Sequence, residues 1–170
     1  MEDNNSVKSK PSDESKKSVV QTAYKYSELT GKIIGCAMRV HSALGNGFQE
    51  VIYQRALEIE MSDVGLSFSR EYEMPVYYKN QQIGTRRADF LVKEVVSVEL
   101  KALTTLEDVH LAQAINYLEA YDLEVGLLIN FGAKSLQHKR LINRKFNQKN
   151  QGNPEIKEIS GSDIKGSDNE

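Results

Sequence analysis

The chain has 170 residues, a length that suits one domain with tails, and its 39% apolar content is low for a chain packed throughout. A net charge of −2 gives the whole protein no general attraction to nucleic acid or acidic membranes. The single cysteine, Cys36, excludes an internal disulfide framework, and no apolar run suits a secretion signal or a membrane span, which together predict a cytoplasmic protein.

Polar residues gather at both ends of the chain. Ser, Asn, Lys, Asp and Glu dominate 1–23 and 148–170, and neither segment shows an apolar period. Such segments cannot bury enough surface to offset the entropy lost on ordering. We therefore predict disordered tails at 1–23 and 148–170, with one folded domain at 24–147.

Three segments of this domain have the apolar spacing of helices. Apolar residues recur every three or four positions over 27–44 and again over 49–64, with a glycine-containing break between them. The third helix is predicted over 105–121, where Thr105 followed by Asp108 resembles a capping box.

Other segments have the composition of strands. The run VGLLI at 125–129 is short and continuously apolar, which is typical of a strand buried on both faces, whereas 137–143 fits a strand or a helix. Pro75 indicates an edge or irregular strand. Three further strands, separated by turns at 79–82 and 93–94, are predicted at 66–78, 83–92 and 95–102. The order α-α-β-β-β-α-β predicts an α/β sandwich around a mixed sheet.

The sequence SVELKAL carries the clearest chemical signal. Alternate strand residues share a face, so Glu99 and Lys101 point one way while Val98 and Leu100 point the other. Asp89 lies among strand formers on the preceding strand. If the two strands are neighbours, two carboxylates suited to Mg²⁺ meet a lysine that can hold an attacking water or stabilise phosphoryl charge. A Glu-x-Lys pair alone is usually a solvated surface pair, so the signal lies in the combination.

Polar residues of the neighbouring helices are less specific. His110, Gln113 and Tyr117 share a face at helical spacing, which suits either a cleft or a half-exposed packing surface. Glu50, at the start of the second helix, is favoured there by the helix dipole alone.

Basic residues are concentrated near the end of the domain. Six basic residues and no acidic one lie over 134–149, which indicates a phosphate-facing edge or a solvated basic end. The candidate nucleic-acid contacts are Arg87, Lys134, Lys139, Arg140 and Arg144.

The segment GFQEVIY at 47–53 resembles the signature of the GxxExxY family. The likeness extends over about 29–143, through RAD at 87–89, VELKA at 98–102, the helix over 113–117 and GLLINF at 126–131. That family resembles a compact branch of the PD-(D/E)XK nuclease superfamily, close to the RecB-type exonucleases. The resemblance implies a three-layer sandwich with a mixed central sheet flanked by helices. Alanine stands at 88, where the superfamily's name has a proline that is not a ligand.

The resemblance also implies roles for particular residues. Mg²⁺ or Mn²⁺ would be bound by Asp89, Glu99 and Glu50, and the catalytic residues would be Lys101, Glu50, Gln113 and Tyr117. Lys101 would serve as the catalytic lysine, and Gln113 and Tyr117 would line the path of the phosphate or the strand.

Two classes of function follow. The first is a metal-dependent nuclease that hydrolyses DNA, or with less support RNA, by a metal-activated water. The second is a catalytically silent module that binds nucleic acid or protein on the same fold. Near-neutral charge and the lack of a recognisable DNA-reading module keep the second class open. They also predict a recruiting protein or a second copy of the chain as a partner.

Overall fold

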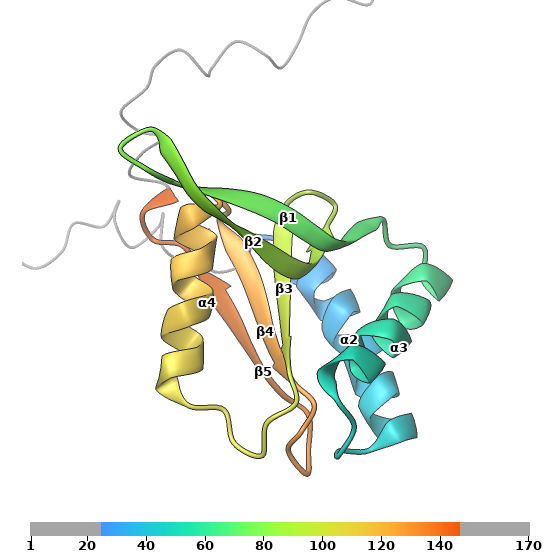
Figure 1. The fold of residues 1–170 in the computed structure, drawn as a ribbon. Coiled ribbons are helices and arrows are strands. Elements are labelled where there is room, and N and C mark those ends of the chain that lie inside the picture. Colours follow the sequence, from blue (N-terminus) through green and yellow to red (C-terminus); the bar gives the residue numbers. More distant parts are fainter. Residues whose placement is uncertain (1–24, 147–170) are drawn as a thin grey trace, which may run out of the picture.

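A computed structural model describes residues 25–146, and the tails predicted at 1–23 and 148–170 lie outside the described residues. Figure 1 shows a sheet with helices on both sides. The predicted element order is confirmed, and the segment that the sequence left open is a strand. The helices are α2 (Ser27–Leu44), α3 (Glu50–Asp63) and α4 (Asp108–Ala120), and the strands are β1 (Phe68–Tyr78), β2 (Gln81–Val92), β3 (Val96–Lys101), β4 (Val125–Asn130) and β5 (Gln137–Ile142).

The sheet is mixed, as predicted. Its five strands follow the order β1-β2-β3-β4-β5, and every neighbouring pair is antiparallel except β3 and β4. Those two parallel strands are joined through α4, because a parallel connection needs a crossover. All six residues of β4 are buried, which confirms a strand covered on both faces.

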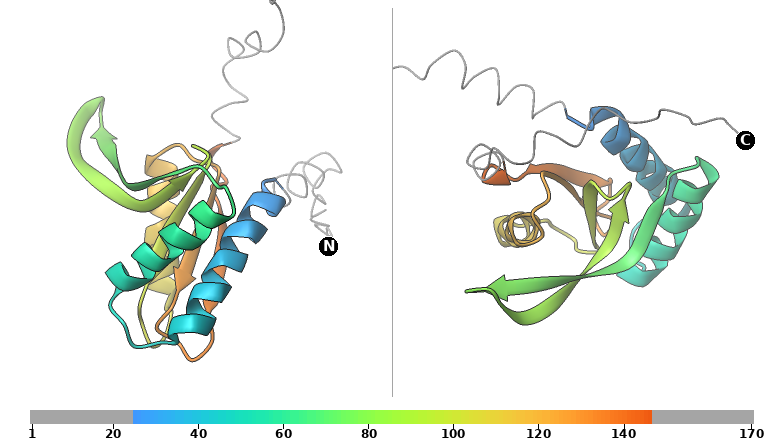
Figure 2. Two further views of the ribbon diagram at one scale, coloured as in Figure 1. Left: turned by 90° about the vertical axis from the view of Figure 1, so that its right-hand side faces the viewer. Right: turned by 90° about the horizontal axis from the view of Figure 1, so that it is seen from above.

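Helices α2 and α3 cover one face of the sheet and α4 covers the other, as the view from above shows (Figure 2). The larger core joins Ile33 and Leu57 of these helices to Val98 of β3. On the opposite face, Leu118 of α4 packs on Leu128 of β4. Burying each such side chain stabilises the fold by about 1.5–3 kcal/mol. No helix within the described residues is long and apolar enough to cross a membrane.

Helix α4 begins later than the sequence predicted. Its N-cap is Glu107, so the start at Thr105 and the capping box of Thr105 with Asp108 were wrong. The Glu107 side chain accepts the backbone N–H of His110, and His110 Nδ1 accepts the Glu107 N–H at 3.1 Å. His110 therefore serves the helix cap, and the predicted polar face loses one of its three members.

The β1–β2 hairpin extends beyond the rest of the sheet. Only Phe90, Leu91 and Val92 of β2 pair with β3, whereas β1 and β2 pair along nearly their whole length. Lys79 and Asn80 connect them with positive φ angles of 49° and 63°, as in a type I′ turn. The hairpin consequently arches away from the sheet, toward the α4 side (Figures 1 and 2).

The loop after β4 passes very close to the loop after β3, and Gly132 permits this. A Cβ at Gly132 would lie 2.5 Å from backbone atoms of Ala102 and Leu103. We expect Gly132→Ala to lower the free energy of unfolding by about 1–3 kcal/mol, because backbone atoms cannot move aside as a flexible side chain does. Urea denaturation measures this change.

The matched control is Gly31→Ala. An added Cβ on this α2 glycine meets nothing within 4 Å. Alanine is the better helix former, so this variant should gain roughly 0.5–1 kcal/mol. Equal stability of the Gly132 variant and the wild type would show that the close approach is not needed.

Candidate active site

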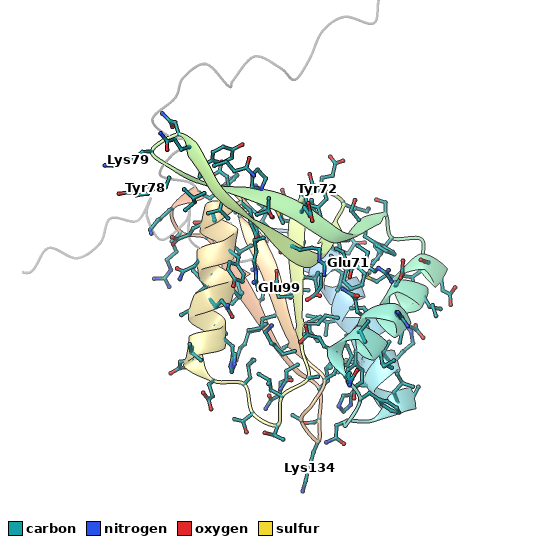
Figure 3. The ribbon with its side chains drawn as sticks, in the orientation of Figure 1. Glu71, Tyr72, Tyr78, Lys79, Glu99 and Lys134 are labelled. Atoms are coloured by element: carbon teal, nitrogen blue, oxygen red, sulfur yellow. The ribbon has the colours of Figure 1, made fainter. Side chains whose placement is uncertain are left out.

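A cavity of about 300 Å³ opens where β2 leaves β3. Four residues that were predicted from the sequence line this cavity: Glu50 of α3, Asp89 of β2, and Glu99 and Lys101 of β3. Figure 3 marks two of the acidic residues, Glu99 on β3 and Glu71 on β1. The lining residues are Glu50, Gln54, Glu71, Thr85, Arg86, Arg87, Asp89, Glu99 and Lys101.

Asp89 is fixed by two hydrogen bonds at the point where the strands separate. Its Oδ2 accepts the backbone N–H of Leu100 at 2.8 Å, and its Oδ1 accepts Gln54 Nε2 at 3.0 Å. Pairing between β2 and β3 ends at Phe90, so the Leu100 amide is satisfied by a side chain rather than by the ladder. Burial raises the pKa of Asp89, and the Leu100 hydrogen bond opposes that rise.

Glu99 is the most confined carboxylate of the cavity. It pairs with Leu128, which packs against α4, so the polar side of β3 lies under a helix and Glu99 is only 7% exposed. Its Oε1 is buried and accepts no hydrogen bond within the described residues. Burial, then the charge of Asp89, raises the pKa of Glu99 to about 7. A buried acceptor without a donor is rare and calls for a proton or a cation.

Glu50 owes its position to the loop before α3. Gly47 in that loop adopts a φ of 109°, which favours glycine. The Tyr53 hydroxyl donates to Gly45 O at 2.9 Å and accepts the Phe48 N–H at 3.1 Å. Tyr53 thereby anchors the start of α3, whose first residue is Glu50. Burial raises the pKa of Glu50, and the nearby Lys101 charge opposes the rise.

Arg86 joins the hairpin to α4 beside the cavity. Its guanidinium lies 4.1 Å from the centre of the Tyr117 ring, and Tyr117 stacks on Tyr121 at 6.1 Å. Arg86 Nε and the Tyr121 hydroxyl are both buried and make no hydrogen bond within the described residues. Burial, then the Glu99 charge, raises the pKa of Tyr121 to about 12. The site therefore extends from the carboxylates to the face of α4.

Several of these residues were missed by the sequence. Gln54 lies four residues after Glu50, and Tyr121 lies four after Tyr117, so helical spacing alone could have found both. Arg86 gave no such signal, because its neighbours depend on how the hairpin twists.

Glu71 was also missed. It lies on β1 between the residues that pair with Phe90 and Ala88 of β2, and so opposite Asp89. Its φ of 52° is unusual for a non-glycine residue within a strand. Arg87, a predicted nucleic-acid contact, also lines the cavity and lies 3.7 Å from the Glu71 carboxylate.

The remaining predicted residues do not gather at the cavity. Gln113 is exposed on α4 and is absent from the lining, whereas Tyr117 reaches the cavity through Arg86. Figure 3 places Lys134 at the far end of the molecule from Glu99. The other basic residues predicted to contact nucleic acid are spread along β5 and past its end, and they are Lys139, Arg140 and Arg144.

The orientation of these basic residues separates them further. Lys139 pairs with Leu128 on the α4 side, and Arg140 pairs with Leu127 on the α2 and α3 side. Arg140 donates a hydrogen bond to the backbone oxygen of Lys25. The basic segment is therefore not a single surface in residues 134–146, and 147–149 lie outside the described residues.

The donor set fits a hard divalent cation. Within residues 25–146, no three His, Cys, Asp or Glu side chains are grouped as the ligands of one ion. Asp89 and Glu99 nevertheless interact through their charges, and none of the described residues donates a hydrogen bond to Glu99 Oε1. Mg²⁺ often takes only one or two carboxylates and completes its shell with water and substrate oxygens. The Asp89–Glu99 pair meets that requirement, and Glu50 lines the same cavity as a further carboxylate.

The sequence model of the PD-(D/E)XK nuclease superfamily matches residues 27–144, and the chain belongs to this superfamily. Members are generally nucleases that act on nucleic acid with divalent metal ions. No curated protein matches the chain. Among solved structures, the chain is similar to that titled "Crystal structure of SSO0001", with 17% identity and a TM-score of 0.44 over 72% of this chain. The match spans 61% of that protein's chain.

The raised pKa of Glu99 predicts how stability depends on pH in metal-free protein. The folded protein holds the Glu99 proton up to about pH 7, whereas the unfolded chain releases it near 4.5. Stability from this group is therefore complete below 4.5 and is lost as the pH rises through 7. The difference corresponds to about 3 kcal/mol. The pKa values of Asp89 and Glu50 are raised as well, so their contributions have the same sign.

Glu99→Gln isolates this contribution, because glutamine resembles the protonated glutamate. In urea denaturation with EDTA, the variant should match the wild type at low pH and be more stable above pH 7. Glu94→Gln, in the exposed β2–β3 turn, is the control and should follow the wild type. Parallel stability curves for wild type and Glu99→Gln would show that Glu99 titrates normally.

Proposed function

We propose that this chain is a Mg²⁺- or Mn²⁺-dependent nuclease of the GxxExxY type, within the RecB-like branch, that hydrolyses DNA more readily than RNA. The observation that carries the proposal is Glu99 Oε1, which is buried beside Asp89 and has no hydrogen-bond donor among residues 25–146, in a cavity that also contains Lys101. A structural protein gains nothing from this arrangement, since crowded buried carboxylates repel one another.

The central residues of the cavity have separate roles in this proposal. Asp89 and Glu99 would hold the ion, which supplies an activated water and a positive charge beside the leaving oxygen. Lys101 would orient the water and stabilise charge on the phosphoryl group. Arg86 would hold a phosphate oxygen, and Tyr117 would orient the Arg86 guanidinium through the contact of that group with its ring.

The outer residues have supporting roles. Glu50 would act as a third carboxylate toward the ion, and Gln113 would contact the strand as it leaves the cavity over α4. The basic residues Arg87, Lys134, Lys139, Arg140 and Arg144 would contact phosphates, with Arg87 nearest the reaction. A recruiting protein or a second copy would bring the domain to its substrate, and the cytoplasm remains the predicted location.

A catalytically silent binding module is the second candidate. Both carboxylate oxygens of Asp89 already accept hydrogen bonds, from Leu100 and Gln54. In this candidate, Asp89 serves only as a structural acceptor, and the chain keeps the fold without the chemistry.

The test incubates the purified protein with labelled single- and double-stranded DNA and RNA, in Mg²⁺, Mn²⁺ or EDTA. We expect cleavage that requires metal and stops in EDTA. A parallel melting experiment should show stabilisation by the same ions. Failure of both the cleavage and the thermal shift would refute the nuclease proposal and leave the binding module.

A further inference from the structure

The outer part of the β1–β2 hairpin, residues 74–87, forms what we call the hairpin arm. Three of its apolar side chains are unusually open to solvent: Tyr77 is 61% exposed, Tyr78 is 62% exposed and Ile83 is 66% exposed. Figure 3 shows Tyr78 and Lys79 at the end of the arm, pointing away from the body of the molecule. Tyr77, Tyr78 and Ile83 do not belong to the hydrophobic cores that the described residues form on the two faces of the sheet.

The charge of the arm is also distinctive. Residues 74–87 (MPVYYKNQQIGTRR) contain three cations and no Asp or Glu, although acidic residues outnumber basic ones in the whole chain. The ammonium group of Lys79 lies 5.5 Å from the centre of the Tyr78 ring. Aromatic faces beside cations complement bases joined by phosphates. The arm itself holds no carboxylate, and Glu71 lies 3.7 Å from Arg87 at the base of the arm.

The arm leads directly into the candidate active site. Thr85, Arg86 and Arg87 belong to the arm and line the cavity that contains Asp89. Asp89 lies eight positions after Gln81, which is at the tip, and extended chain of that length spans about 26 Å. The antiparallel ladder, which shifts register once between Val76 and Tyr77, and the two-residue turn hold the arm as a paired ribbon rather than a loose loop.

We propose that the hairpin arm binds single-stranded nucleic acid, with unpaired bases stacked on Tyr77 on one face of the hairpin and on Tyr78 on the other, and with phosphates following Lys79, Arg86 and Arg87 into the cavity. This inference rests on the proposed function and names its substrate class. Unpaired bases are required because a duplex hides the faces of its bases within its own stack. Stacking also tolerates any base, so the arm selects strandedness and not sequence.

Self-association through the arm is disfavoured by its charge. In a two-fold symmetric contact the same surface meets itself, so Lys79 at the tip would face like charges and meet no carboxylate of the arm. Binding of a polyanion such as nucleic acid would instead neutralise the cations of the arm.

The test measures fluorescence anisotropy in EDTA, where no cleavage occurs. The probes are labelled oligothymidylate, oligouridylate and a DNA duplex of equal length. Tyr77→Ala/Tyr78→Ala should weaken binding of the single strands by at least about tenfold. Tyr77→Phe/Tyr78→Phe keeps the ring faces and should bind as the wild type does. The two single strands together show whether the arm accepts both sugars.

One control and one further test variant accompany these tyrosine substitutions. Met38→Ala/Ile59→Ala removes apolar side chains of similar exposure, 54% and 62%, from α2 and α3 and should leave binding unchanged. Lys79→Gln should reduce the slope of log affinity against log salt by about 0.7, the value for one phosphate contact on a single strand.

Sedimentation of the same variants tests the competing partner. Unchanged single-strand binding by the double alanine variant would overturn the inference. A wild-type dimer that dissociates only in this variant would also overturn it. The outcome is separate from the nuclease test. Binding that depends on the arm, without any cleavage, would support the proposed role of the arm and refute the proposed nuclease activity. Metal-dependent cleavage with binding that does not depend on the arm would support the nuclease activity and refute the role of the arm.

Discussion

Lys101→Ala is expected to lower the single-turnover cleavage rate by about 100- to 1,000-fold, the usual effect of removing one preorganised group that stabilises transition-state charge. Lys101 ends β3 and lines the cavity with the carboxylates of Glu50, Asp89 and Glu99. Its backbone oxygen accepts the Phe131 N–H at 2.8 Å, a bond that the substitution leaves intact. The fold should therefore survive.

Metal binding distinguishes this result from a general loss of structure. Removing a cation beside Glu50, Asp89 and Glu99 leaves their negative charge less compensated, so Mg²⁺ or Mn²⁺ should bind Lys101→Ala at least as tightly as the wild type. Isothermal titration measures this affinity. Lys32→Ala, on the exposed face of α2, is the control and should keep full activity. Wild-type cleavage by Lys101→Ala, or loss of its metal binding, would contradict the assigned role.

Glu99→Gln and Asp89→Ala are each expected to abolish the thermal stabilisation that a divalent ion gives the wild type. An ion present at about 100 times its dissociation constant stabilises the folded state by roughly 2.7 kcal/mol, and this gain disappears with the ligand. Differential scanning calorimetry with and without Mn²⁺ measures the change. A full metal-induced shift in either variant would remove that carboxylate from the site.

The two variants should differ when metal is absent. In the part of the chain that the structure describes, Glu99 Oε1 has no hydrogen-bond donor, so Glu99→Gln relieves repulsion and should melt higher than the wild type at neutral pH. Asp89 accepts hydrogen bonds from Leu100 and Gln54, so Asp89→Ala leaves two donors unsatisfied and should melt lower. If both variants were stabilised, Asp89 would have no structural role in the metal-free protein.

The sequence by itself determined the order of the elements and the face of the sheet on which each β3 side chain lies. Both depend on side-chain period, which is a local property: apolar Val98 and Leu100 must face a core, so Glu99 and Lys101 must share the other side. The buried run of β4 and the edge position of Pro75 follow equally from local composition. None of these features depends on how distant elements meet.

Only the tertiary structure decided how the site is enclosed. The strand pattern leaves the Glu99 side of β3 polar, but α4 covers it and thereby raises the pKa of Glu99 to about 7. The divergence of β2 from β3 leaves the Leu100 amide to Asp89, and the twist of the hairpin brings Arg86 over Tyr117. These contacts join residues far apart in the chain, and their geometry depends on the angles at which the hairpin and helices pack, which no local period encodes.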